Sequence, residues 1–251
     1  MSGISYEAAS GPPGIRIYAI GDIHGRFDLL QEMHRKIGKD LARRQPADWR
    51  VIHLGDYVDR GPQSRDVIEF LLERQNLHGP DRIVALVGNH DQGFLDFMES
   101  TEGEMLFARF GGDTTAASYG VDADFTSPAT RQKARDDLRY AVPPSHLAFL
   151  GSLSRAIDFG DFFFCHAGIR PGLALDAQDP TDLIWIRDEF LDDERLHEKV
   201  VVHGHTPVSV AEIRRNRVNL DTRAYATGRM MALVIEEAEK DLIEIRGSPA
   251  E

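Results

Sequence analysis

The chain has 251 residues, 42% of them hydrophobic and 28% charged, so it can bury a substantial core and is typical of a globular protein. Its formal net charge of −12 argues against a broad nucleic-acid surface, which requires clustered lysine and arginine. Cys165 is the only cysteine, so no intrachain disulfide can form. The sequence has no apolar run of membrane-spanning length and no secretory signal pattern. We therefore expect a cytoplasmic protein with no membrane or nucleic-acid partner.

Residues 1–14 are predicted to be a flexible tail, because Gly11-Pro12-Pro13-Gly14 breaks regular structure. A single domain is expected over residues 15–251, and it begins with alternating strands and helices. In the first helix, for example, Leu30, Met33 and Ile37 fall three or four residues apart. This alternation predicts βαβ units and a partly parallel sheet. The predicted strands span 15–20, 51–54 and 83–87, and the predicted helices span 27–44, 64–75 and 91–98.

Residues 99–150 lose this alternation. Glycine-containing loops are expected at 111–115 and 118–120, and short helices at 128–139 and 145–150. We interpret this region as a cap-like insertion that shapes the mouth of a site; the alternative is a packing excursion without a substrate role. The remainder is strand-rich, with one helix at 182–191, and indicates an antiparallel or mixed sheet. Its predicted strands span 156–159, 162–165, 199–202, 217–220, 230–235 and 242–246.

Five predicted strands end in the same kind of polar, glycine-containing turn. The richest of these turns is Gly55-Asp56-Tyr57-Val58-Asp59-Arg60-Gly61, directly after the apolar run 51–54. A single histidine or aspartate beside a strand is usually a packing or surface residue. Five similar turns indicate a shared site, because ligands gather at the carboxyl ends of strands. The other four are Gly21-Asp22-Ile23-His24-Gly25, Gly88-Asn89-His90-Asp91, His166-Ala167-Gly168 and Gly204-His205-Thr206.

These turns offer carboxylate, imidazole and amide ligands without thiolates. Such donors suit Mn, Fe, Zn or Mg rather than a structural zinc site. The set is larger than one metal ion needs, but two ions that share a carboxylate would use all of it. The candidate ligands are Asp22, His24, Asp56, Asn89, His166 and His205.

Taken in their order along the chain, the five motifs resemble those of the phosphoprotein phosphatase family within the calcineurin-like metallophosphoesterases. The resemblance covers about residues 15–235. The resemblance implies an α/β (α+β) fold, with a central mixed β-sandwich flanked by helices and a dimetal site at the C-terminal ends of the strands. It implies two divalent ions, with manganese expected first and iron, zinc or magnesium as alternatives. One ion would be held by Asp22, His24 and Asp56, and the other by Asp56, Asn89, His166 and His205.

The resemblance also implies a reaction and roles for further residues. A hydroxide that bridges the metals would attack the phosphorus directly, with His90 as general acid and Asp59 holding its imidazole. Arg60, Arg187 and Asn89 would contact the phosphate. On the residues alone, Asp59 could instead form a salt bridge with Arg60, and Arg187 could be an ordinary helix-surface residue.

The first expectation for function is a bacterial or phage-type serine/threonine protein phosphatase that acts on a phosphoprotein or phosphopeptide. Asp59, Arg60 and the loop 111–120 resemble those of such enzymes. The alternative is a hydrolase of dinucleoside polyphosphates or other small phosphoesters. A third interpretation, a non-catalytic phospho-binding protein, conflicts with the complete ligand set. Two positions depart from the family pattern: Asp91 replaces a glutamate, and Arg223 replaces a glycine, where it would crowd the site or add a phosphate contact.

Overall fold

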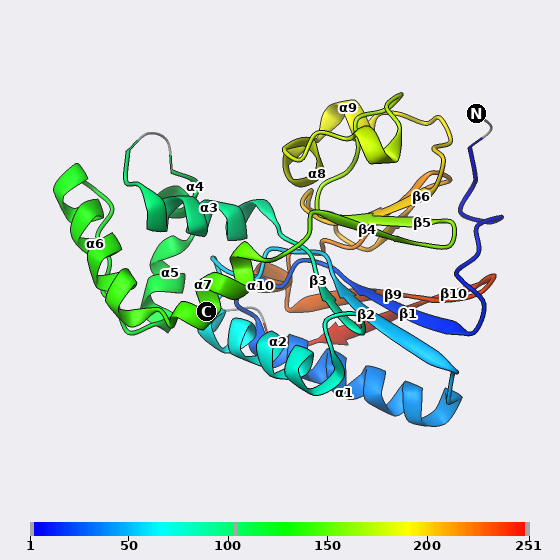
Figure 1. Cartoon of the computed structure of the whole chain (residues 1–251), viewed down its shortest axis with the longest axis horizontal. Coiled ribbons are helices and arrows are strands. Elements are labelled where there is room, and N and C mark those ends of the chain that lie inside the picture. Colours follow the sequence, from blue (N-terminus) through cyan, green and yellow to red (C-terminus); the bar gives the residue numbers. More distant parts are fainter. Residues whose placement is uncertain (1–2, 103–104, 249–251) are drawn as a thin grey trace.

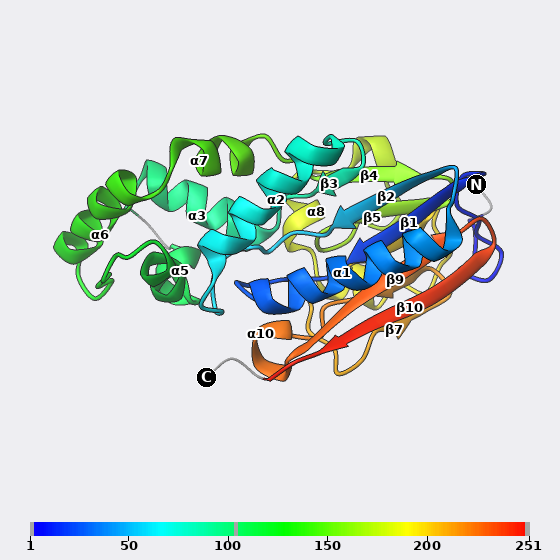
Figure 2. The same ribbon diagram turned by 90° about the horizontal axis from the view of Figure 1, so that it is seen from below.

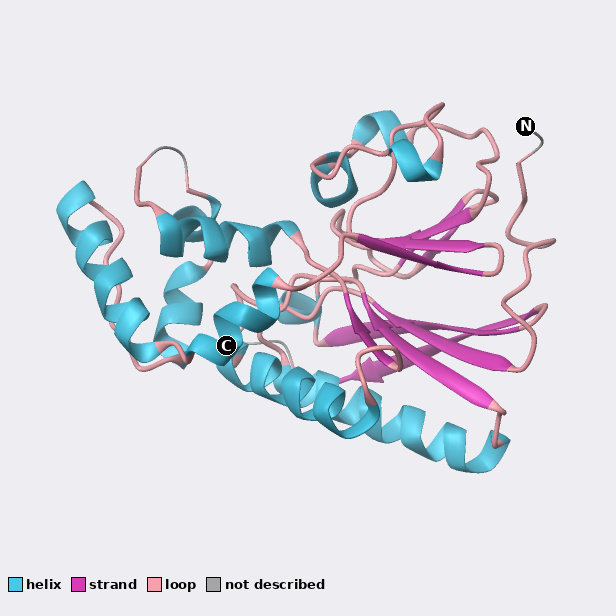
Figure 3. Ribbon diagram, in the orientation of Figure 1, coloured by secondary structure: helices cyan, strands magenta, loops and turns pink. Residues whose placement is uncertain are grey.

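Two five-stranded mixed sheets pack face to face and carry helices on their outer sides (Figure 1). The computed structural model describes residues 3–102 and 105–248. Colouring by secondary structure separates the two layers of strands from the helices that surround them (Figure 3). The predicted α/β fold, a mixed β-sandwich flanked by helices, is confirmed.

The first sheet has the strand order β10-β9-β1-β2-β3. Its parallel part consists of β1 (Ile15–Ile20), β2 (Asp48–His53) and β3 (Ile83–Ala85), and its antiparallel edge of β9 (Arg229–Glu236) and β10 (Glu239–Arg246). The crossover helices are α1 (Phe27–Arg44) and α2 (Ser64–His78). Both cover the outer face of this sheet (Figure 2), because parallel neighbours need crossovers that cover a face.

The second sheet has the strand order β4-β5-β6-β8-β7. Its central strands β5, β6 and β8 are parallel, and β4 and β7 pair antiparallel at the edges. The prediction of a mixed second half is therefore confirmed, although β7 was not predicted. The bounds are β4 Ala156–Phe159, β5 Phe162–Cys165, β6 Val200–His203, β7 Glu212–Ile213 and β8 Arg217–Asn219.

The central strands are apolar on both faces because each sheet is covered on both sides. Ile17 and Ala19 of β1 belong to the core between the sheets, together with Phe164 of β5. Tyr18 and Ile20, one residue along, belong to the core under the helices. Side chains of a strand alternate between its faces, so the continuous apolar run of β1 fills two cores at once.

A helical insertion follows β3 and extends beyond the sheets (Figure 1). It consists of α3 (Asn89–Glu99), α4 (Leu106–Arg109), α5 (Gly112–Ser118), α6 (Pro128–Ala141) and α7 (Pro144–Gly151). The predicted helices at 128–139 and 145–150 correspond to α6 and α7. The loop prediction for 111–115 and 118–120 is wrong where α5 forms, because Thr115 and Ala116 of this short helix are buried against the turn after β2 and the insertion core.

Two further predictions need correction. Residues 3–14 are not a free tail: the N–H groups of Ile4 and Tyr6 donate to the carbonyls of His197 (2.9 Å) and Arg215 (2.7 Å), and Ala9 is fully buried. Met1 and Ser2 lie outside the described residues. The helix expected at 182–191 is two short helices, α8 (Asp182–Trp185) and α9 (Asp188–Leu191), because the backbone between them is extended at Ile186. The remaining short elements are η1 (Leu175–Ala177) and α10 (Ala224–Thr227).

None of the helices in the described part of the chain is both long and apolar enough to cross a membrane.

Candidate functional site

The polar turns at the ends of β1, β2, β3, β5 and β6 meet between the two sheets. Every predicted metal ligand lies there and is at most 5% exposed. Burial of so many polar side chains is costly unless each is hydrogen-bonded or bound to an ion. The residues brought together are Asp22, His24, Asp56, Asn89, His90, His166 and His205.

The backbone of these turns is unusually tight. His24, Asp56 and His205 all adopt left-handed conformations, with φ between 45° and 64°. At Gly55 (φ 111°) an added Cβ would lie 2.6 Å from the backbone nitrogen of Gly88, so a side chain there would collide with the next turn. Left-handed backbone costs energy for residues other than glycine and is typical of functional sites.

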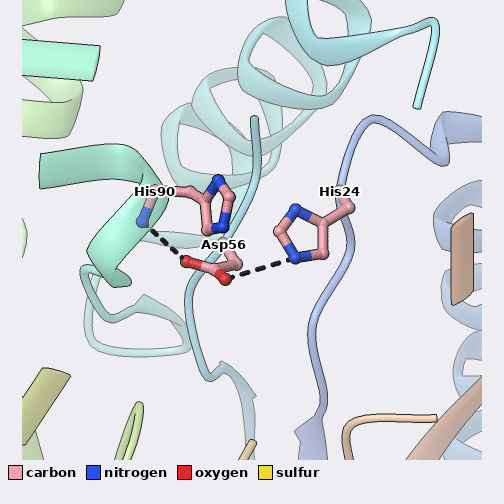
Figure 4. Close-up of side chains that lie close together, drawn as sticks. All are labelled: His24, Asp56 and His90. Carbon is pink, nitrogen blue, oxygen red and sulfur yellow. Dashed lines mark hydrogen bonds and ion pairs between the residues drawn. The ribbon is translucent and has the colours of Figure 1, made fainter. Parts of the chain in front are cut away.

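Asp56 lies at the centre of the cluster. Its Oδ1 accepts the N–H of His90 at 3.0 Å and lies 3.4 Å from Nε2 of His166, and its Oδ2 lies 3.2 Å from Nε2 of His24. Figure 4 shows His24 and His90 on either side of this carboxylate. Two groups of potential metal ligands share it: His24 and His90 in one, Asp22 and His166 in the other. These groups differ from the predicted sets, which placed Asp22 with His24 and gave His90 no part as a ligand.

Asp91 fixes the turn that carries Asp56. Its carboxylate accepts three backbone N–H groups, those of Asp56, Tyr57 and Gly88, each at 2.8 Å. It thereby joins the turn after β2 to the turn after β3. The shorter aspartate at position 91 reaches all three N–H groups, so its replacement of the family's glutamate leaves the turn fixed.

The imidazoles have the protonation that a metal site requires. Nδ1 of His24 donates to the carbonyl of Val58 (2.8 Å) and Nδ1 of His166 donates to that of Leu54 (3.0 Å), so each Nε2 carries a lone pair. Burial lowers the pKa of His24 to about 4 and that of His205 to about 2. These rings are therefore neutral near pH 7, as metal ligands must be.

Several of these electron pairs face one another. Oδ1 of Asn89 lies 2.9 Å from Nε2 of His166, which carries a lone pair, whereas Nδ1 of His205 can donate to the same oxygen at 2.9 Å. Nε2 of His24 is buried without any hydrogen-bond partner among the described residues. A cation stabilises lone pairs that converge in a buried site, and this donor set fits divalent metals.

His90 forms a pair with Asp59. Its Nδ1 donates to Oδ2 of the fully buried Asp59 at 2.7 Å. Burial lowers the pKa of His90, but Asp56 and Asp59 outweigh it, so the pKa lies above its ordinary value. The alternative role for Asp59, a salt bridge with Arg60, is not what the structure has: the guanidinium of Arg60 donates instead to Nε2 of His90 at 3.0 Å.

Both predicted phosphate-binding arginines reach the cluster. Arg60 and Arg187 line a cavity of about 140 Å³ together with Asp56, Asn89 and His90. Arg187 lies at the break between α8 and α9, so it is not an ordinary residue on the surface of one helix.

Sequence reasoning missed several residues around this cavity. Tyr225 of α10 holds Arg60: its ring centroid lies 4.8 Å from Cζ of the guanidinium, and its hydroxyl accepts a hydrogen bond at 3.2 Å. Thr115 of α5 contacts Asp59, and the exposed rings of Phe110 and Trp185 flank the opening. An exposed aromatic gives no periodic signal in a sequence. Only Thr115 lay in a motif that resembled the family.

Arg223 lies on an exposed turn in a left-handed conformation (φ 52°). Its N–H donates to the carboxylate of Asp221 (2.8 Å), and burial raises the pKa of that carboxyl to about 6. The arginine side chain is not among the described residues that line the cavity. Of the two alternatives for Arg223, crowding of the site therefore has no support in the structure, and a phosphate contact stays a prediction.

Comparison with known proteins agrees with this geometry. The model of the family "Calcineurin-like phosphoesterase" matches residues 15–234. The chain is 28% identical over 241 residues to a bis(5'-nucleosyl)-tetraphosphatase PrpE [asymmetrical] of Bacillus mycoides, covering 88% of this chain and 90% of the relative.

Solved structures show the same fold. A putative diadenosine tetraphosphatase superposes with a TM-score of 0.65 at 18% identity, covering 99% of this chain and 100% of that one. A serine/threonine protein phosphatase of Saccharomyces cerevisiae superposes with a TM-score of 0.60 at 16% identity, covering 94% and 81%. With the buried ligand cluster at the strand ends and the family match along most of its length, the chain belongs to the calcineurin-like phosphoesterase family, the metal-dependent hydrolases of phosphoesters.

Proposed function

We propose that this enzyme hydrolyses dinucleoside polyphosphates. The observation that carries the proposal is an aromatic cleft beside the metal-ligand cluster. A cavity of about 590 Å³ begins at Asn89 and runs outward along α3 and α4. Phe110 and Trp185 line both this cavity and the smaller one over the cluster. This volume suits a ligand of nucleotide size.

The two aromatic rings are suited to stacking on a nucleobase. Phe110 is 51% exposed and Trp185 is 41% exposed, so part of each ring is accessible to a ligand. The Trp185 ring lies 6.1 Å from that of His205, so a base stacked on it would be next to the phosphate position. Base–aromatic stacking contributes about 1–3 kcal/mol per base.

Charge along the cleft favours the same orientation. Arg60 and Arg187 lie at the inner end, where the phosphate to be cleaved would bind. The outer part is lined by the acidic residues Asp96, Glu99 and Glu102 and by the basic Arg109, so acidic groups prevail there and would oppose the binding of further phosphates. The outer part therefore suits a nucleoside, whose amino groups can donate to carboxylates.

The chain's own residues orient and activate the substrate. Arg60 and Arg187 would grip the phosphoryl oxygens, and Asn89 would contribute a further contact. When bound by Asp22, His24, Asp56, Asn89, His166 and His205, two divalent ions, with manganese our first expectation, would activate a water molecule and neutralise phosphoryl charge. Arg60 would leave Nε2 of His90 as it turns to the phosphate, so that this nitrogen can carry a proton for the leaving group.

A second candidate is hydrolysis of phosphoserine or phosphothreonine in proteins. The 2.7 Å contact between His90 and Asp59 supports it. An alkoxide leaving group depends on a proton donor far more than the phosphate of a departing nucleotide does. The pair of His90 and Asp59 is therefore most useful for the hydrolysis of phosphomonoesters of alcohols.

The test compares kcat/KM for diadenosine tetraphosphate and for a phosphoserine peptide, with each metal added to metal-free protein. We expect a clear preference for the dinucleotide. The products, two ADP or AMP with ATP, identify which phosphate is attacked. A preference for the phosphopeptide would overturn the first proposal in favour of the second.

A further inference from the structure

Thr115 connects the helical insertion to the acid pair. Its fully buried hydroxyl accepts the N–H of Asp59 at 2.8 Å and donates to Oδ1 of the same residue at 2.9 Å. A hydroxyl has one proton, and here the carboxylate takes it. In the third contact, at 3.1 Å, the hydroxyl of Ser64 must therefore be the donor to Thr115.

Helix α5 and the residue before it are attached at two more points, one on the turn after β2 and one on the first turn of α2. The carbonyl of Gly111 accepts the N–H of Arg60 at 3.3 Å, and the hydroxyl of Ser118 accepts the N–H of Arg65 at 3.2 Å. At Gly111, an added Cβ would lie 2.5 Å from the backbone nitrogen of Arg60. Of these three attachments, the one through Thr115 reaches the Asp59 carboxylate.

The two carboxylate oxygens of Asp59 have separate partners. Oδ1 faces Thr115 and Oδ2 faces Nδ1 of His90 at 2.7 Å. A carboxylate can rotate about its Cβ–Cγ bond unless both oxygens are held. Such a rotation would change the direction of the hydrogen bond between Oδ2 and the imidazole. The Thr115 hydroxyl supplies that restraint, and both residues are fully buried.

We propose that Thr115 is a positioning residue for the hydrolysis reaction: it orients Asp59 and, through Asp59, sets the imidazole of His90. The helical insertion then belongs to the proton-delivery apparatus as well as to the mouth of the cleft. This inference rests on the proposed role of His90 as proton donor, and it is independent of whether the substrate is a dinucleotide.

The test uses small phosphomonoesters whose leaving groups become progressively more basic, from 4-nitrophenyl to phenyl to alkyl phosphate. The rate of wild-type enzyme should depend weakly on leaving-group basicity, and that of His90→Asn strongly. Thr115→Val should fall between them, with a loss of about tenfold on the most basic leaving group and little loss on 4-nitrophenyl phosphate. Thr115→Ser, which keeps the hydroxyl, should restore the wild-type dependence.

Ser118→Ala is the matched control, because it removes the contact with Arg65 and a hydrogen bond to the carbonyl of Thr115 (2.7 Å) but leaves the Thr115 hydroxyl and Asp59 in place. It should keep the wild-type dependence on the leaving group. If Thr115→Val does not fold, Thr115→Cys replaces it, since a thiol is a weak donor of similar size.

A second readout does not need the metal-loaded enzyme. In metal-free protein, the Nδ1 proton of His90, assigned by its absence in His90→Asn, should move upfield in Thr115→Val and stay in place in Ser118→Ala. An unchanged proton shift together with a wild-type leaving-group dependence in Thr115→Val would overturn the inference. An unchanged dependence in His90→Asn would overturn it as well, whereas failure to cleave diadenosine tetraphosphate would affect only the proposed substrate.

Discussion

The turns at the strand ends and the rim of the cleft meet at one cavity but are built in opposite ways. At the strand ends, His166 is fully buried and Asp56 is 2% exposed, and their side chains share contacts. At the rim, Phe110 and Trp185 are about half exposed and come from separate helical segments. A change in the buried cluster leaves other polar groups unpaired, whereas a change at the rim alters only what the surface can bind.

This contrast separates the chemistry from the choice of substrate. The buried cluster sets the ligands, the acid pair and the phosphate position for any phosphoester. The rim decides which group attached to the phosphorus is favoured. Variants in the two regions should therefore differ in kind. Variants of the buried cluster should affect substrates with and without a nucleobase, and variants of the rim only those with a nucleobase.

The largest effect on rate is expected for His90→Asn. It should leave the bound metal unchanged and slow hydrolysis of an alkyl phosphate by ~10²–10⁴, because the leaving alkoxide loses its proton donor. Loss for 4-nitrophenyl phosphate should be smaller. His146→Asn is the matched control, since His146 is also buried and bonded to a carboxylate, that of Glu69 (2.9 Å), but outside the site. Equal losses on both substrates would remove His90 from the acid role.

A smaller and more selective effect is expected for Trp185→Ala. If stacking contributes about 1–3 kcal/mol, KM for diadenosine tetraphosphate should rise by about tenfold. Hydrolysis of 4-nitrophenyl phosphate should not change. Tyr140→Ala is the control, because Tyr140 is 96% exposed on α6, away from the cleft. The same loss on both substrates would show that Trp185 supports the buried cluster rather than the rim.

The smallest effect is expected for Arg223→Gly. Glycine adopts φ of 52° without the steric cost that arginine bears, so the free energy of unfolding should rise by about 1 kcal/mol, measured by urea denaturation. Gln45→Gly, at another exposed left-handed position (φ 48°), should behave alike. Activity should be unchanged in both. A fall in kcat/KM for Arg223→Gly alone would show that this arginine contacts substrate.

The sequence predicted the buried cluster far better than the rim. The five polar turns follow apolar strands, and the order of the strands brings their carboxyl ends together, so Asp56 and His166 could be placed from pattern alone. Phe110 and Trp185 carry no such pattern. The position of Phe110 depends on how the helical insertion folds back over the site, and that of Trp185 on the break in the helix before Arg187. The N-terminal segment was misjudged for a related reason: its hydrogen bonds go to partners such as Arg215 that are distant in sequence.

The most direct test of the buried cluster is the metal content of wild-type protein and of Asp56→Asn after loading with manganese and removal of free ion. Wild type should retain two ions per chain. Asp56→Asn should lose tight binding at both positions, because the carboxylate that both ligand groups share is gone. Retention of two tightly bound ions by Asp56→Asn would contradict the assignment of Asp56 as the shared ligand.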